Sequence, residues 1–156
     1  MAAEGHLRLL PTVVEAGLGT IAREITIGAP PEVVFSYFTD PARHVAWQGK
    51  QVQIDPRPGG ALRIDFGPGY VAVGRYLEVD PPRRLVYTWG WAEEGSSVIP
   101  PGSSTVEVVL EARGDGTVLR LRHSGLPEDT LDFHGHGWDE TLPTMAAAAG
   151  AWRPEG

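Results

Sequence analysis

Cysteine is absent from the 156 residues of the chain, which excludes disulfide bonds, thiolate metal ligands and a cysteine nucleophile. Long apolar runs are also absent, and none approaches the roughly 20 residues that cross a bilayer. The first residues lack the basic flank and apolar stretch of a secretory signal. We therefore expect a cytoplasmic protein that does not insert into a membrane.

Positive charge is scarce. Thirteen Lys and Arg residues stand against 20 Asp and Glu residues, and the net charge of −7 opposes binding to phosphate backbones and anionic lipid surfaces. The arginines alternate with acidic residues and form no basic stripe, so nucleic acid is not an expected partner. No glycine-rich phosphate loop follows a strand, so nucleotide binding has no support.

The remaining composition is that of an ordinary globular domain. Hydrophobic residues make up 42% of the chain and charged residues 21%, which argues against disorder. A chain of this length buries roughly 70% of the surface that it exposes when unfolded. We predict one domain over residues 20–152, preceded at residues 1–19 by a loosely attached arm or added edge segment.

The pattern of apolar residues predicts the order of elements. Alternation within residues 20–27 indicates a strand, prolines at 30 and 31 begin a short helix, and Asp40 with Pro41 begins a second helical turn. Six further strands follow with short turns, so they must be antiparallel. The last segment has helical spacing, and Pro143 predicts a kink or a late helix start there.

This order resembles the helix-grip fold of the START and polyketide-cyclase superfamily. Local motifs over about residues 20–150 are similar to the branch related to activators of the heat-shock chaperone ATPase. They are Ala29-Pro30-Pro31-Glu32-Val33-Val34-Phe35, Trp47, Arg57-Pro58-Gly59-Gly60, Gly74, Glu78-Val79-Asp80-Pro81-Pro82-Arg83-Arg84-Leu85, Thr88-Trp89 and Gly137-Trp138.

The resemblance implies an α+β fold in which a curved antiparallel sheet of about seven strands wraps around the C-terminal helix. It also implies an apolar cavity between the sheet and that helix, which the superfamily uses for lipids, polyketides and other hydrophobic molecules. The alanine run 146–149 stands where larger side chains are expected. We therefore predict a roomier cavity at that end, lined by Trp89, Leu121 and Trp138.

His123 is the clearest polar residue expected inside the sheet, because it shares the parity of Leu121. Its imidazole could hydrogen-bond a ligand or transfer a proton. The alternative is a core histidine whose nitrogens are satisfied by the backbone or by a tryptophan.

Arg75 shares the parity of its neighbours Val73 and Leu77 and could point inward toward a ligand carboxylate. The alternative is an arginine at a strand bulge or at the cavity mouth, paired with Asp65 or Glu24. Aromatic and aliphatic residues complete the predicted ligand-binding set, either as cavity walls or as plain core. They are Trp89, Trp138, Leu121, Tyr87, Phe35 and Leu142.

Two histidines, His134 and His136, have Asp132 and Asp139 nearby and suggest a metal site only weakly. On a helix the two imidazoles would diverge, so we predict no metal and no other cofactor. Outward Tyr70, Tyr76 and Val86 would permit a homodimer.

Three functions follow, in order of preference. The first is cofactor-free binding of a small hydrophobic molecule, with His123 as polar anchor and no catalysis. The second is a cyclase or hydrolase that uses His123 as acid or base, together with a second polar group such as Tyr87 or Arg75. The third, by resemblance, is interaction with a chaperone ATPase.

Overall fold

The computed structural model describes residues 5–92 and 99–153. Its elements are β1 (Leu7–Glu15), β2 (Leu18–Ile27), α1 (Pro31–Thr39), α2 (Pro41–His44), β3 (Gln51–Ile54), β4 (Ala61–Asp65), β5 (Val71–Asp80), β6 (Arg84–Trp91), β7 (Ser104–Arg113), β8 (Gly116–Pro127), a 3-10 turn η1 (Glu128–Thr130) and α3 (Leu131–Ala151).

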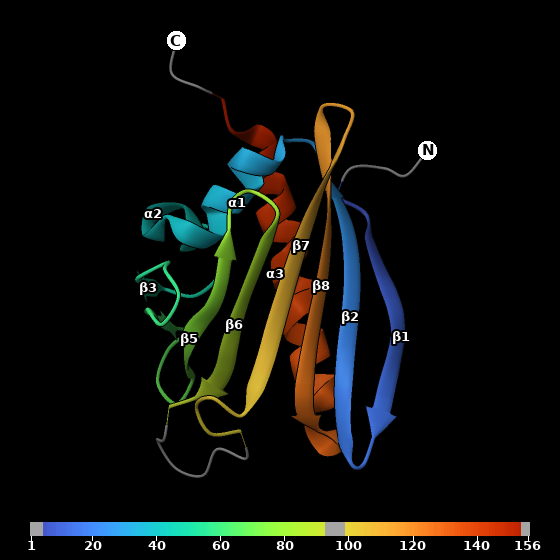
Figure 1. The fold of residues 1–156 in the computed structure, drawn as a ribbon, viewed down its shortest axis with the longest axis vertical. Coiled ribbons are helices and arrows are strands. Elements are labelled where there is room, and N and C mark those ends of the chain that lie inside the picture. Colours follow the sequence, from blue (N-terminus) through green and yellow to red (C-terminus); the bar gives the residue numbers. More distant parts are fainter. Residues whose placement is uncertain (1–4, 93–98, 154–156) are drawn as a thin grey trace.

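The strands form one antiparallel sheet in the order β1-β2-β8-β7-β6-β5-β4-β3. Figure 1 shows this sheet curving around α3, with α1 and α2 at one end. The predicted α+β helix-grip architecture is confirmed, with eight strands where about seven were expected. Among the described residues, no helix is long and apolar enough to span a bilayer.

The additional strand is β1, in the segment predicted as an arm. It pairs with β2 from Leu7↔Ile25 to Glu15↔Leu18 and forms one edge of the sheet. Most of its side chains are exposed on both faces, so residues 7–15 form an edge segment, the second of the two forms expected for the arm.

The turns and caps follow local chemistry. Pro31 opens α1, and the Asp40 carboxylate accepts a hydrogen bond of 3.0 Å from the backbone N–H of Ala42, which caps α2 as predicted. α3 begins at Leu131 and continues through Pro143, so the expected late start is wrong. The helix is continuous although Pro143 has no N–H for the carbonyl of Asp139.

The core lies between the concave face of the sheet and the helices. One large buried cluster contains residues from β2, from β4 to β8, from α1 and from α3 between Trp138 and Ala149. The start of α3 lies close to β2. A Cβ atom added at Gly19 would lie only 2.6 Å from the side chain of Leu131. The buried face of α3 therefore lies directly on the sheet.

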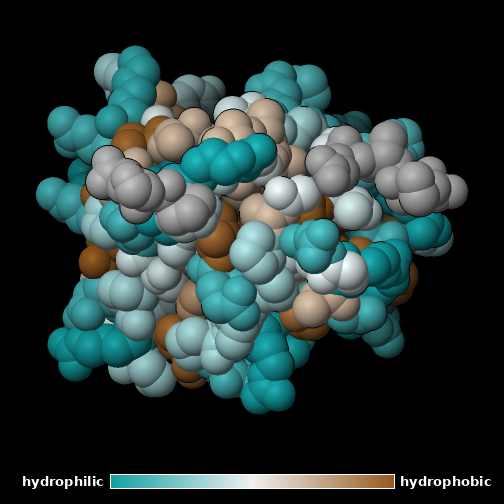
Figure 2. Space-filling view, turned by 90° about the horizontal axis from the view of Figure 1, so that it is seen from above, coloured by the Kyte–Doolittle hydropathy of each residue, from teal (hydrophilic) through white to brown (hydrophobic). Residues whose placement is uncertain are grey.

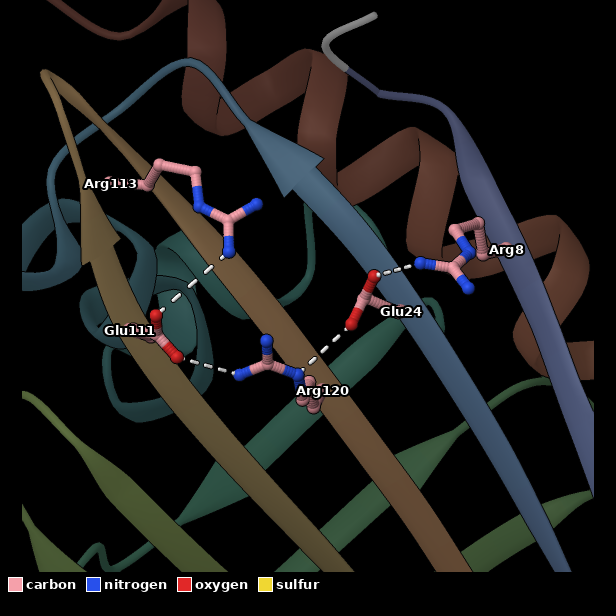
Figure 3. Close-up of polar contacts among 5 residues, drawn as sticks. All are labelled: Arg8, Glu24, Glu111, Arg113 and Arg120. Carbon is pink, nitrogen blue, oxygen red and sulfur yellow. Dashed lines mark hydrogen bonds and ion pairs between the residues drawn. The ribbon is translucent and has the colours of Figure 1, made fainter. Parts of the chain in front are cut away.

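The outer face of the sheet carries a chain of ion pairs that crosses four strands (Figure 3). Glu24 on β2 contacts Arg8 on β1 and Arg120 on β8, each at 3.0 Å. Arg120 also contacts Glu111 on β7 at 2.9 Å, and Glu111 is 3.9 Å from Arg113. The expected alternation of arginines and acids is thus a solvated, paired surface.

Candidate functional site

A cleft of about 260 Å³ lies between the first half of α3 and the ends of β4 and β6. This is the lower end of the molecule in Figure 1. Figure 2 views the opposite end, where hydrophobic residues form small patches between hydrophilic ones. Six aromatic side chains line the cleft, namely Phe66, Tyr70, Trp89, Trp91, Phe133 and Trp138.

Trp91 lies at the centre of these rings. Its ring centroid is 5.6 Å from that of Trp89 and 6.2 Å from that of Tyr70, and both pairs meet nearly edge to face. Phe66 and Phe133 are 5.8 and 5.9 Å from it. These separations are those of favourable aromatic pairs, so the rings support one another as a wall.

Two exposed rings lie at the mouth of the cleft. Tyr70 precedes β5 and Phe133 is in the first turn of α3, and each is 53% exposed. Their centroids are 6.2 Å apart with planes inclined by 27°. Segments distant in sequence therefore meet across the opening.

The fully buried His123 lies behind the cleft and makes two hydrogen bonds. The Ser104 hydroxyl donates to the Trp89 carbonyl at 2.7 Å, so His123 Nε2–H donates to Ser104 Oγ at 2.9 Å. His123 Nδ1 accepts from the indole of Trp138 at 3.1 Å. Burial, and then the nearby His134, hold the pKa of His123 well below its usual range. The ring is neutral, and both nitrogens are occupied.

His134 on α3 repeats this arrangement at the cleft wall. Its Nδ1–H donates to the Thr130 carbonyl at 2.9 Å, and its Nε2 accepts from the indole of Trp91 at 3.0 Å. Burial lowers the pKa of His134. Two tryptophans of the cleft are therefore each held by a neutral histidine.

The third indole, that of Trp89, has no such partner. Its Nε1 is buried and makes no hydrogen bond within the described residues. Gln48, also in the lining, accepts a hydrogen bond of 2.7 Å from His44 through its side-chain oxygen. Burial lowers the pKa of His44 to about 4, so that imidazole is neutral.

The structure brings only part of the predicted site together. Trp89 and Trp138 line the cleft, and His123 faces inward as expected but is satisfied by Trp138 and Ser104. The aliphatic and remaining aromatic members lie buried in the core outside the cleft lining, and these are Leu121, Tyr87, Phe35 and Leu142.

Of the two positions considered for Arg75, the inward one is wrong. Its side chain is exposed and Nη1 donates to the carbonyl of Gly59 at 3.1 Å, whereas its neighbour Tyr76 points inward and is fully buried. The outward position expected for Tyr76 is therefore also wrong, and Val86 is 9% exposed. Of the three residues considered for a homodimer, only Tyr70 is exposed.

The expected position of the roomy cavity is also wrong. The cleft lies beside the first half of α3, while Ala146 and Ala149 are buried in the core and Trp152 packs against that cluster. The Tyr37 hydroxyl donates to the Ala148 carbonyl at 3.2 Å. The end of α3 that carries the alanines is thus packed into the core and contacts α1.

The histidine pair on α3 diverges as expected. His134 is buried, whereas His136 is exposed and lies 2.8 Å from Glu140 one turn later. No group of three or more metal-binding side chains occurs in the described part of the chain. The solvated position expected for His134 is wrong.

Sequence reasoning omitted most of the lining. Phe66 has the parity of the buried Leu62 and Ile64, and His134 is one helical turn before Trp138, so periodicity could have identified both. Tyr70 and Gln48 lie outside regular elements, where periodicity gives no direction.

A family model for Activator of Hsp90 ATPase homolog 1-like protein matches residues 28–150. A fission yeast relative, Uncharacterized protein C1711.08 of Schizosaccharomyces pombe, is 35% identical over 108 residues. The match covers 69% of this chain, and the chain spans only 30% of that relative's length.

Solved structures show the same fold. CalU16 from Micromonospora echinospora superposes with a TM-score of 0.73 at 28% identity, covering 94% of this chain and 87% of CalU16. The AHSA1-like protein RHE_CH02687 from Rhizobium etli gives a TM-score of 0.69 at 39% identity, covering 88% of this chain and 85% of that one.

Proposed function

This chain belongs to the family of Activator of Hsp90 ATPase homolog 1-like proteins, and from the cleft that it builds within that fold we propose that it binds a small hydrophobic molecule. The observation that carries the proposal is the cleft lined by six aromatic rings beside α3. Ligand sites are typically concave and mainly apolar, with a few polar groups that set orientation.

The size of the cleft limits the ligand. A volume of about 260 Å³ lies just below the range of roughly 300–1,000 Å³ that is typical of sites for drug-sized molecules. The cleft is open to solvent through the mouth formed by Tyr70 and Phe133. A compact molecule of one or two rings fits these dimensions better than a long lipid chain.

The geometry gives less support to catalysis by His123. A general acid or base needs a nitrogen within reach of the substrate, and both nitrogens of His123 are bonded to Ser104 and Trp138. Neither of the expected helpers, Tyr87 and Arg75, lines the cleft. The support for a role in chaperone interaction is the description of the matching family.

A glycine on α3 permits a direct test. Gly137 lines the cleft, and a Cβ added there meets no atom within 4 Å. Gly137→Leu should fill the cleft and also favour the helix. Gly150→Leu is the matched control, because Gly150 lies on the same helix, outside the cleft lining, and equally has no atom within 4 Å of an added Cβ.

The measurement is a titration with the neutral, fluorescent, two-ring molecule 1-naphthylamine. We expect saturable binding at one site for the original chain and for Gly150→Leu, with affinity weakened at least tenfold in Gly137→Leu. Equal affinity in all three proteins would place the ligand elsewhere. No saturable binding in the original chain would refute the proposal.

A further inference from the structure

Three tryptophans line one cleft, and their indole N–H groups differ in whether they have a partner. Those of Trp91 and Trp138 each donate to a neutral histidine, at 3.0 and 3.1 Å. The N–H of Trp89 is buried without a partner in the described structure. A buried donor left unpaired costs about 1–3 kcal/mol, so of the three indole N–H groups this one would gain most from an acceptor that a ligand supplied.

Position also distinguishes this N–H from the other unpaired polar groups. The buried atoms without partners include the hydroxyls of Tyr76 on β5 and Tyr87 on β6. These two residues pair across the strands, and their ring centroids are 6.0 Å apart. Neither tyrosine lines the cleft, whereas Trp89 does. Its nitrogen has no solvent-accessible surface, so a ligand oxygen reaches it only when the surrounding rings shift as the ligand enters.

The second free group in the lining is also a donor. Gln48 accepts from His44 through its oxygen, and no hydrogen bond joins its amide nitrogen to the described residues. A ligand that meets these two donors must present an acceptor such as a carbonyl oxygen. The aromatic walls, in turn, favour a flat body that can stack or meet the rings edge on.

The charges of the lining argue against an ionised acceptor. Glu140 and His136 are the ionisable side chains at the rim and they pair with each other at 2.8 Å. No lysine or arginine is among the described side chains that line the cleft. Arg23, the buried arginine under α3, is bound to Asp139 at 2.6 Å.

We propose that the ligand of this cleft is a neutral, planar aromatic molecule bearing a carbonyl-type oxygen, and that the indole N–H of Trp89 donates to that oxygen. The inference rests on the proposed binding function and specifies its chemistry. Trp89 thereby takes the anchoring role that the sequence had suggested for His123.

The test compares two molecules that differ in one group. 2-Acetonaphthone carries a ketone, and 2-isopropenylnaphthalene has a CH₂ group in place of the oxygen. Isothermal titration should show the ketone binding the original chain several-fold, up to about tenfold, more tightly, as expected for one hydrogen bond between neutral groups. In Trp89→Phe this preference should disappear, while in Tyr87→Phe, which removes an unpaired donor outside the cleft, it should remain.

The outcomes separate the two proposals. If neither compound binds the original chain, the binding function itself fails. If both bind equally, or if the preference survives in Trp89→Phe, the cleft binds aromatic molecules but the role of Trp89 is refuted. If Trp89→Phe does not fold, the two affinities for the original chain still decide whether an acceptor is recognised. 2-Naphthoate should bind more weakly than the ketone, and tighter binding would refute the preference for a neutral molecule.

Discussion

Arg23 on β2 and Asp139 on α3 form an ion pair that joins the helix to the sheet. Arg23 Nε is 2.6 Å from Asp139 Oδ1, and Nη2 is 3.4 Å from Oδ2. Only 7% of the Arg23 side chain is exposed, against 30% for Asp139. The two partners therefore depend on the pair to different degrees, since water can solvate the aspartate far better than the arginine.

Removing the aspartate should cost more than removing the arginine. Asp139→Ala leaves a buried guanidinium unpaired, and we expect a loss of about 3 kcal/mol in the free energy of unfolding. Arg23→Met leaves a carboxylate that water can reach, and we expect about 1 kcal/mol. Urea denaturation of both variants and of the double variant checks this ranking. A larger loss for Arg23→Met would contradict the conclusion that Arg23 depends on the ion pair more than Asp139 does.

Gly135 tests how tightly α3 packs over that pair. Gly→Ala inside a helix normally stabilises by about 0.5–1 kcal/mol. A Cβ at Gly135, however, would lie 2.9 Å from Arg23 Nη2, whose position Asp139 fixes. We expect Gly135→Ala to give no gain or a loss, while Gly137→Ala, with open space around it, shows the usual gain. Thermal unfolding distinguishes the two variants. Equal increases in stability would show that the Arg23 side chain moves aside at little cost.

His44 predicts a loss of stability in acid. Burial lowers its pKa from 6.5 to about 4. Between these two values, the histidine is protonated in the unfolded chain and neutral in the folded chain. This contribution is complete above pH 6.5 and is lost as the pH falls toward 4, by up to about 3 kcal/mol. His44→Phe should retain the stack on Trp47, whose ring lies 4.9 Å away, and reduce the pH dependence, while the buried His123 and His134 maintain the rest.

The measurement is urea denaturation at pH 7.5, 6, 5 and 4.5 for the original chain, His44→Phe and the control His6→Gln, which changes an exposed histidine. The slope of stability against pH should fall in His44→Phe alone. An unchanged slope would mean that His44 is not the residue whose protonation opposes folding.

Alternation along the strands predicted the fold well because most strands have one buried and one exposed face. It placed Trp89 and His123 inward, where they lie. It failed on β5, where the larger apolar residues Val73 and Leu77 were assigned to the core. Tyr76 is on the buried face, and the pairing of β5 with β6 shifts register between Tyr76 and Glu78. Before this shift the buried residues are Ala72 and Tyr76, and the small side chain of Ala72 gives little signal against Val71 and Val73, so the face assigned to Arg75 was wrong.

The candidate site was harder to predict because it is formed by contacts distant in sequence. Tyr70 meets Phe133 only after the β4–β5 turn and the start of α3 come together. The satisfaction of His123 likewise depends on Trp138 from α3 and Ser104 from β7. Residue type and parity indicate that a histidine points inward, but not whether its nitrogens are already bonded.

The arrangement of the three indoles has a spectroscopic consequence. Three of the five tryptophans in the chain line the cleft, and two of them are hydrogen-bonded to histidines. Indole emission responds to polarity, to hydrogen bonding and to quenching by nearby groups. Much of the protein's intrinsic fluorescence therefore originates at the site, and the molecule carries its own optical reporter of whatever enters it.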